Sequence, residues 1–164
     1  MTPLALLALQ IVTSFAALVE LVRGSGWYRR ATPRQVLIAL LWVHVPRFVP
    51  LGLLAPGQVG ADVSRSTLGL VAWGDFAASA LALLALARLR AQAADATAAV
   101  WLFSIVSTAD IVVALTEGLG TGLYRHPLGL GWFVLVLYVP AVCVSQALLF
   151  SVLARSTAHP GSEP

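Results

Sequence analysis

The chain has 164 residues, of which 59% are hydrophobic and 10% are charged. Soluble domains carry about 25% charged residues, so this composition excludes an ordinary soluble domain and indicates an integral membrane protein. All ten basic residues are arginines, and the absence of lysine excludes a Schiff-base lysine and a P-loop. The single cysteine, Cys143, excludes an intrachain disulfide and a cysteine zinc site.

Five segments are apolar and long enough to cross a bilayer, which takes about 20 helical residues. We predict an all-α, polytopic membrane protein with a single domain, a bundle of five transmembrane helices over residues 1–154. The first segment lacks a basic leader and a cleavage site, so we expect a retained helix rather than a signal peptide. The predicted helices cover residues 3–22, 36–54, 67–88, 97–117 and 128–153.

The arginines of the predicted loops favour one orientation. Seven lie in the first loop, the third loop or after the last helix, whereas the second and fourth loops hold one each. The positive-inside rule then places the N-terminus outside and the C-terminus in the cytoplasm (N-out/C-in), with residues 155–164 as a disordered tail. Because the composition is typical of a GC-rich bacterial genome, we expect a multipass protein of the bacterial inner (plasma) membrane.

Polar residues recur at one depth in the five predicted helices. They lie about seven to ten residues from the helix ends assigned to the outside, and at 1.5 Å per residue their levels agree within about 5 Å. An ionisable residue within a span is a functional-site hypothesis by default. We therefore predict a site for a ligand or a proton in the outer half of the bundle, formed by His44, Arg47, Asp75, Asp110, Gln10 and Tyr138.

The charges of this set constrain one another. Arg47 stays protonated, so it should face the bundle interior and pair with Asp75, Asp110 or both. The second aspartate must then hold a proton or be balanced by a protonated His44, so the four groups should share about one exchangeable proton. Such a set suits a proton-linked site and equally suits an anionic or zwitterionic ligand. An ion-pair network that only fixes the helix register is the alternative.

Three prolines interrupt the predicted helices at a similar depth. Pro46, Pro50 and Pro140 each lack an amide hydrogen, so each leaves a backbone carbonyl without its helical partner. Such a carbonyl must find another donor or line a wet cavity, and Arg47 could supply donors. Ordinary kinks of membrane helices are the simpler interpretation.

Motifs for catalysis and metal binding are absent from the sequence. There is no nucleophile elbow, no HExxH and no clustered acidic motif, so no catalytic residue is assigned. His44 with two aspartates could hold a divalent ion, but the adjacent Arg47 cation argues against a metal. A second haem ligand is missing, because His126 falls in a predicted loop and His159 in the tail. We therefore expect no metal and no cofactor.

The pattern of His44 with Arg47, Gly74 with Asp75, and the buried Asp110 resembles that of a group of small bacterial multipass inner-membrane proteins with no assigned activity. The resemblance covers most of the second to fifth helices. Length and helix count are also similar to those of the tryptophan-rich sensory/translocator protein family, which binds porphyrins and sterol-like ligands. The tryptophan and asparagine motifs of that family are absent, so this similarity concerns the architecture alone.

Three functions fit these observations. The first is a small integral membrane carrier or ligand-binding protein with a buried, proton-sensitive site, whose ligand is small and polar or amphipathic. A carrier of this size would be expected to act as a homodimer. The second is a structural subunit that binds a partner membrane protein. The third, a membrane enzyme acting on a lipid or quinone with His44 and Asp110 as acid and base, has the least support. We expect the bilayer as a partner and no nucleic acid.

Overall fold

The computed structural model describes residues 2–57, 63–126, 128–129 and 131–158, and within these ranges the chain is helical with short connections and no strand. Five helical segments are long and apolar enough to cross a membrane, which confirms the predicted all-α class and the number of such helices. They run over Pro3–Gly24, Pro33–Leu54, Arg65–Arg90, Ala96–Gly120 and Gly131–Arg155.

The ends of these helices differ from the predicted ends by a few residues. The second segment begins at Pro33 because Thr32 and Gln35 form a capping box, in which each side chain accepts a hydrogen bond from the amide of the other. The fourth continues to Gly120, so the first part of the predicted fourth loop is helical. The last helix reaches Ala158, which shortens the predicted tail, and residues 159–164 lie outside the described residues.

Two of the long segments change their helix type next to proline. The second consists of α3 (Pro33–His44) and the 3-10 helix η1 (Val45–Leu54), in which Pro46 and Pro50 remove two amide donors. The last consists of α6 (Gly131–Phe133), the π-helical turn η3 (Val134–Tyr138) and α7 (Val139–Ala158), with Pro140 at the start of α7. The sequence predicted the missing hydrogen bonds but not these changes of pitch.

Side chains other than Arg47 satisfy the carbonyls at the start of η1. In 3-10 geometry the amide that Pro46 lacks would bond to Val43, and the Val43 carbonyl accepts a hydrogen bond from the Tyr138 hydroxyl instead, at 2.8 Å. The Val45 carbonyl accepts from Ser79 Oγ at 2.5 Å. The donors to these two carbonyls therefore come from Tyr138 and Ser79 and not from Arg47.

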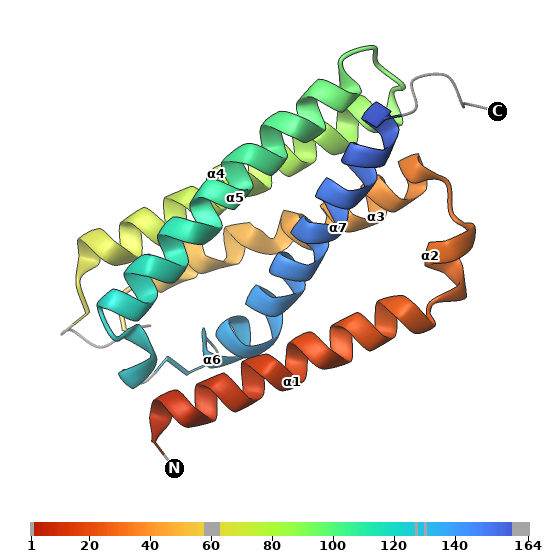
Figure 1. Cartoon of the computed structure of the whole chain (residues 1–164). Helices are drawn as coiled ribbons and strands as arrows, with labels where there is room; N and C mark the ends of the chain where they lie inside the picture. The colour runs from red at the N-terminus through yellow and green to blue at the C-terminus, as the bar shows by residue number, and fades with distance from the viewer. Residues whose placement is uncertain (1, 58–62, 127, 130, 159–164) are drawn as a thin grey trace.

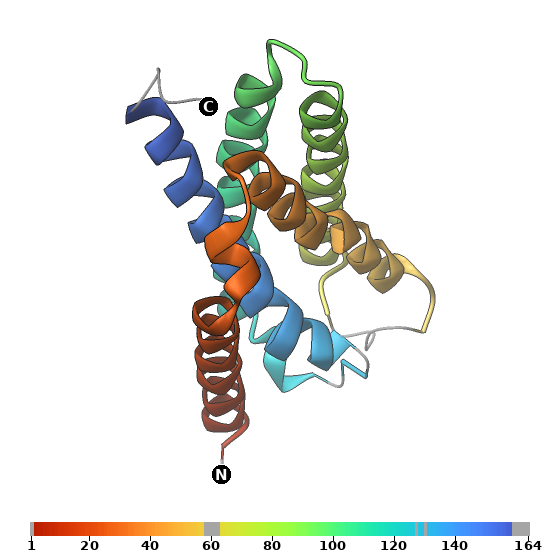
Figure 2. The ribbon, with the colours of Figure 1, turned by 90° about the vertical axis from the view of Figure 1, so that its right-hand side faces the viewer.

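The helices pack around an antiparallel pair, α4 (Arg65–Arg90) and α5 (Ala96–Gly120). The segment α3–η1 lies along α4, and α7 crosses the bundle against α3 and α5 (Figures 1 and 2). Helix α1 (Pro3–Gly24) lies at the edge, against α7 and η3, and Leu7 is its one buried side chain. The short helix α2 (Gly26–Arg30) connects α1 to α3.

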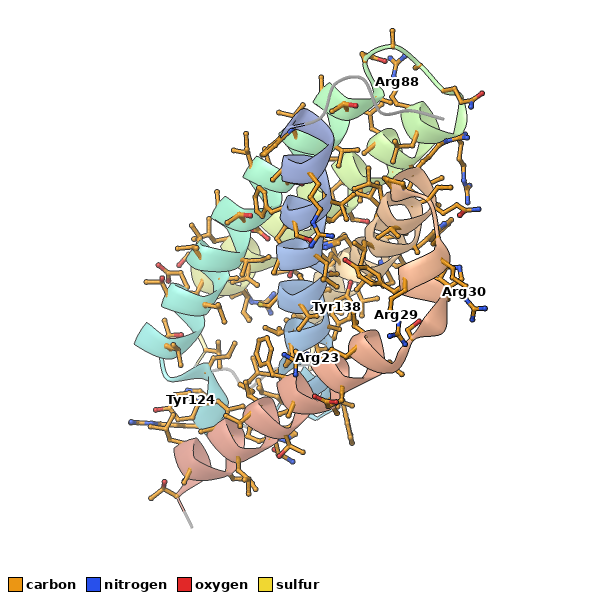
Figure 3. The ribbon with its side chains drawn as sticks, turned by 45° about the vertical axis from the view of Figure 1, so that its right-hand side comes forward. Arg23, Arg29, Arg30, Arg88, Tyr124 and Tyr138 are labelled. Atoms are coloured by element: carbon orange, nitrogen blue, oxygen red, sulfur yellow. The ribbon has the colours of Figure 1, made fainter. Side chains whose placement is uncertain are left out.

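The two ends of the bundle differ in charge. Figure 3 places Arg88 beside the α4–α5 connection at one end and Tyr124, in the turn η2 (Leu123–Arg125), at the other. We call the first the arginine-rich end. There Arg34 of α3 donates to the carbonyls of Leu89 and Arg90, at 3.0 and 3.2 Å, and so caps the C-terminus of α4. Part of the arginine excess therefore has a structural use.

A continuous apolar core fills the half of the bundle next to the arginine-rich end. Leu41, Val100, Phe103 and Leu149 are fully buried there. Helix α4 contributes small residues to this contact, including the fully buried Ala82. Small side chains let helix backbones approach closely, which is how membrane helices gain packing contacts.

Replacing Ala82 with leucine should therefore disrupt the contact, because extra methylene groups in a packed core displace their neighbours. We expect Ala82→Leu to lower the free energy of unfolding by about 1–3 kcal/mol. The control is Ala80→Leu, since Ala80 lies on the same helix and is exposed. Thermal unfolding of the purified variants in detergent measures the difference, and equal stability of the two variants would contradict this description of the core.

Candidate functional site

Arg47 is the centre of the polar contacts inside the bundle. It lies on η1 and its side chain is 3% exposed. Its Nε donates to Asp75 Oδ1 of α4 at 2.7 Å, its Nη1 donates to Ser107 Oγ of α5 at 2.6 Å, and its Nη2 donates to Asp110 Oδ2 of α5. All three guanidinium nitrogens therefore bond to protein groups, and one side chain joins three helical elements. The predicted pairing of Arg47 is present, with both aspartates.

Gly74 makes room for the Asp110 carboxylate. A Cβ atom at this position would overlap Asp110 Oδ1 and would lie 2.9 Å from its Cγ. Any side chain here would push the carboxylate away from Arg47. The close contact between α4 and α5 thus depends on the glycine that precedes Asp75.

His44 is fully buried, but it does not bond to this cluster. Its Nε2 lies 2.9 Å from Ser145 Oγ, and its ring packs edge-on against Phe103. Because the Ser145 hydroxyl donates to the Val142 carbonyl at 2.9 Å, it accepts from His44, so Nε2 carries the proton. Nδ1 has no hydrogen-bond partner among the described residues, so a hydrogen on Nδ1 would be a buried donor without an acceptor, which favours the neutral imidazole.

The cluster carries more negative than positive charge. Asp75 and Asp110 face one guanidinium, and a neutral His44 adds nothing, which leaves one excess negative charge when both carboxylates are ionised. Asp75 Oδ2 and Asp110 Oδ1 accept no hydrogen bond from the described part of the chain. The side chains are 15% and 10% exposed, so these oxygens can meet a further proton or cation.

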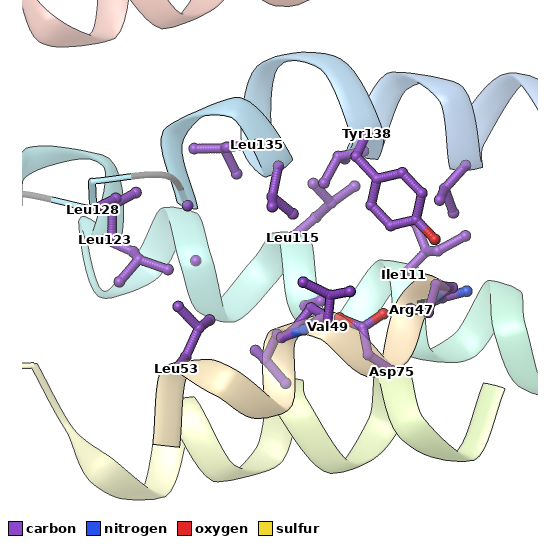
Figure 4. Close-up of a pocket in the computed structure, with 18 of the residues that line it drawn as sticks. Arg47, Val49, Leu53, Asp75, Ile111, Leu115, Leu123, Leu128, Leu135 and Tyr138 are labelled. Atoms are coloured by element: carbon purple, nitrogen blue, oxygen red, sulfur yellow. Dashed lines mark hydrogen bonds and ion pairs between the residues drawn. The ribbon is translucent and has the colours of Figure 1, made fainter. Parts of the chain in front are cut away.

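A cavity of about 340 Å³ extends from this cluster toward the end of the bundle opposite the arginines. In Figure 4, Arg47, Asp75 and Tyr138 lie at one end of it, and Leu123 and Leu128 lie at the other. Its walls are otherwise apolar, with side chains from η1, α4, α5, η3 and α7. The π-helical turn places Tyr138 on this wall. The cavity thus has an apolar body and one polar end.

The two carboxylates meet different spaces. Asp75 lines the cavity, whereas Asp110 lines a groove on the outer surface of α4 and α5, between Trp73, Gly74 and Ala109. Arg47 bonds to both and lies between them. The site is therefore accessible from the cavity at one aspartate and from the flank of the bundle at the other.

The structure brings together only part of the predicted set. Arg47, Asp75 and Asp110 are in contact, and Tyr138 lines the same cavity. His44 lies in a separate buried contact, as described above. Gln10 lies on α1 and accepts a hydrogen bond from Trp132 Nε1 at 3.0 Å, away from the cluster.

Two further residues of the cluster and the cavity were not in the predicted set. Ser107 binds Arg47 directly, and its position three residues before Asp110 on one helix face is the signal that could have identified it. Cys143 lines the cavity, and no sequence pattern indicated this.

The model of one protein family, described as Domain of unknown function (DUF8737), matches residues 4–154. The chain therefore belongs to this family, and the match includes every residue of the cluster and the cavity. No curated protein and no solved structure matches the chain significantly.

The contact between Gly74 and Asp110 can be tested with two alanine substitutions on one helix. We expect Gly74→Ala to lower the free energy of unfolding by about 1–3 kcal/mol, because the new methyl group displaces the carboxylate. Gly69→Ala is the control, since a Cβ there meets no atom within 4 Å, and it should be neutral or stabilising.

The cost of Gly74→Ala should also disappear when Asp110 is already alanine, which a double-mutant cycle measured by thermal unfolding will show. A cost that is unchanged in the Asp110→Ala background would mean that the methyl group strains some other contact.

Proposed function

We propose that the protein is a multipass membrane protein that binds or carries a small amphipathic ligand in the cavity next to Arg47. The observation that carries this proposal is the cavity itself, whose apolar walls end at one buried polar cluster. Small-molecule sites are typically concave and mostly apolar, with a few polar groups that orient the ligand, and have volumes of about 300–1,000 Å³. The cavity of about 340 Å³ falls within this range.

The distribution of arginines supports an orientation for this site. Under the positive-inside rule the arginine-rich end lies in the cytoplasm, and both the N-terminus and the cavity lie toward the outside. The apolar core then lies in the cytoplasmic half, while the outer half contains the cavity. A ligand would enter from the outer side or from the outer leaflet.

The excess negative charge supports a proton-sensitive site. Two ionised carboxylates beside one guanidinium in an apolar environment are unfavourable, because the second charge is unbalanced. A proton bound to the carboxylate pair restores neutrality when the cavity holds no cation. Proton and ligand binding would then be linked through Asp75 and Asp110.

The single cysteine provides a test of the cavity, because Cys143 lines it. We expect a thiol reagent that cannot cross the membrane to modify Cys143 when it is added from outside to intact cells. Ala114→Trp should slow this modification at least about tenfold, because Ala114 lines the cavity and an indole would fill part of it.

Val112→Trp is the matched control, since Val112 lies on the same helix and is 58% exposed on its outer face. It should leave the rate unchanged. Modification from the cytoplasmic side alone would contradict the orientation, and equal rates for the two tryptophan variants would contradict the cavity.

A structural role is the second candidate, and one observation favours it. All three guanidinium nitrogens of Arg47 are bonded to protein groups, as expected of a network that holds helices together. Removing one partner of a buried ion pair costs about 3–5 kcal/mol, whereas replacing the whole network with apolar residues is often neutral or stabilising. The two candidates therefore differ in one prediction. If the cluster has only a structural role, replacing all of its charged residues with apolar ones should remove nothing but the network, whereas a binding site would also lose its ligand or proton dependence.

We expect Arg47→Met alone to destabilise the fold by about 3–5 kcal/mol, because it leaves two buried carboxylates without a partner. The triple variant Arg47→Met, Asp75→Leu, Asp110→Leu should recover a stable fold but lose any ligand or proton dependence at the cavity. Thermal unfolding at several pH values measures both effects. A wild-type stability that varies with pH no more than that of the triple variant would favour the structural role alone.

A further inference from the structure

We infer that the ligand of this cavity is an amphipathic amine, with one protonated ammonium group at Asp75 and an apolar body along the cavity. This inference rests on the proposed function and specifies the class of its ligand. It depends on which polar atoms at the end of the cavity are already engaged, and on the sign of the charge that remains.

The guanidinium of Arg47 offers little to an anionic ligand. Three of its five N–H groups donate to Asp75, Ser107 and Asp110, so every nitrogen is already bonded and one N–H group on each Nη is left for an anion. Bidentate binding, which makes arginine effective toward anions, needs two free donors on one edge. The two nearby carboxylates would also repel an anion.

The free oxygen atoms at the end of the cavity are acceptors. Asp75 lines the cavity and uses one carboxylate oxygen for Arg47, while the other accepts no hydrogen bond from the described residues. The Tyr138 hydroxyl donates its hydrogen to the Val43 carbonyl, so its oxygen can only accept on the cavity side. An ammonium group has donors alone, and it matches these two acceptors.

The charge of the cluster agrees with this match. When both carboxylates are ionised, Asp75 and Asp110 contribute two negative charges and Arg47 one positive charge, which leaves one negative charge for the ligand to balance. A monovalent cation makes the site neutral, whereas a neutral ligand leaves it unbalanced and an anion adds to the imbalance. The aromatic face of Tyr138 adds a further favourable surface for a cation.

The remaining walls require that most of the ligand be apolar. Val49, Leu53, Leu115 and Leu135 line the cavity between its polar end and its opposite end. A hydrophilic cation would lose its hydration along these walls without compensation. The chemistry thus favours an alkyl or aryl amine over an inorganic cation.

Protons should compete with such a ligand, because both use the same excess charge. The titratable or charged groups around the Asp75 carboxylate come from every element packed against it: Arg47 of η1, His44 of α3, Asp110 of α5, Tyr138 of η3 and Cys143 of α7. Among these, the carboxylates are the groups whose protonation removes negative charge. Amine binding should therefore weaken as the pH is lowered.

Cys143 can report the sign of the charge directly. Two methanethiosulfonate reagents of similar size, one with a trimethylammonium group and one with a sulfonate group, will be reacted with the full-length protein in lipid nanodiscs. Rates are divided by those with a free thiol in solution. At a pH at which both carboxylates are ionised, we expect the cationic reagent to be favoured by about tenfold, because one excess negative charge then lies at the polar end of the cavity.

Two variants, each with one aspartate replaced by asparagine, test which carboxylate causes the preference for the cationic reagent. Asp75→Asn should abolish it, and Asp95→Asn should leave it unchanged, since Asp95 lies next to Arg88 at the arginine-rich end. Thermal unfolding verifies that both variants are folded. A preference that survives in folded Asp75→Asn would overturn the assignment to this residue.

The preference for an amine can also be tested on the wild-type protein, with ligands that share one alkyl chain and differ in the head group. Decylammonium should protect Cys143 from a small neutral maleimide, whereas decanoate and decanol should protect at least about tenfold less well. Protection by decylammonium should also weaken as the pH is lowered.

Failure of this inference differs from failure of the proposed function. Equal protection by the three head groups, or faster reaction with the anionic reagent, would contradict an amine as the ligand but would still agree with a ligand site in the cavity. If Cys143 reacts with none of the reagents until the protein is unfolded, the cavity is closed and both proposals fall.

Discussion

The structure depends on one buried guanidinium. Arg47 contacts groups on α4 and α5 from its position on η1, and each contact would be costly to leave unmade in an apolar environment. The arginine therefore fixes the lateral positions of three helical elements at one depth. Gly74 follows from the same constraint, because the Asp110 carboxylate occupies the space of its missing side chain. The cavity lies beside this point, where polar contacts join the helices.

The prolines determine the shape of the polar end. A regular α-helix through Pro46 and Pro50 would leave carbonyls without donors, and the tighter 3-10 helix changes which carbonyl is left. The Val43 carbonyl then accepts from Tyr138, whose position on η3 follows from the π-helical turn before Pro140. Two local departures from α-helical geometry thus meet in one hydrogen bond, and that bond orients the tyrosine on the cavity wall. Such departures often occur at functional sites.

Hydropathy was sufficient to predict the five long helices, because the length of an apolar segment depends on the chain alone. Comparing the depths of polar residues along the predicted helices also identified Arg47, Asp75 and Asp110, since charged groups in apolar surroundings must pair with one another. It failed for Gln10, because depth says nothing of which helices are neighbours, and α1 lies at the edge of the bundle. It failed for His44 for a similar reason: helical spacing places it near Arg47, but its ring faces Ser145 of α7.

The position of Arg47 between two carboxylates would let a charge placed in the cavity act on the contacts between helices. Without a cation in the cavity, Asp75 and Asp110 compete for one guanidinium, and each has an oxygen to spare. An ammonium group would donate a hydrogen bond to the Asp75 carboxylate from the cavity side and balance its charge. Asp75 would then interact less strongly with Arg47, and Arg47 would interact more strongly with Asp110. Because Asp110 lies on α5 and Asp75 on α4, this change in balance acts on the contact between the two helices that form the centre of the bundle. A change of charge in the cavity would thereby become a change in helix packing, which is the physical requirement for coupling a bound ligand to a movement of the protein.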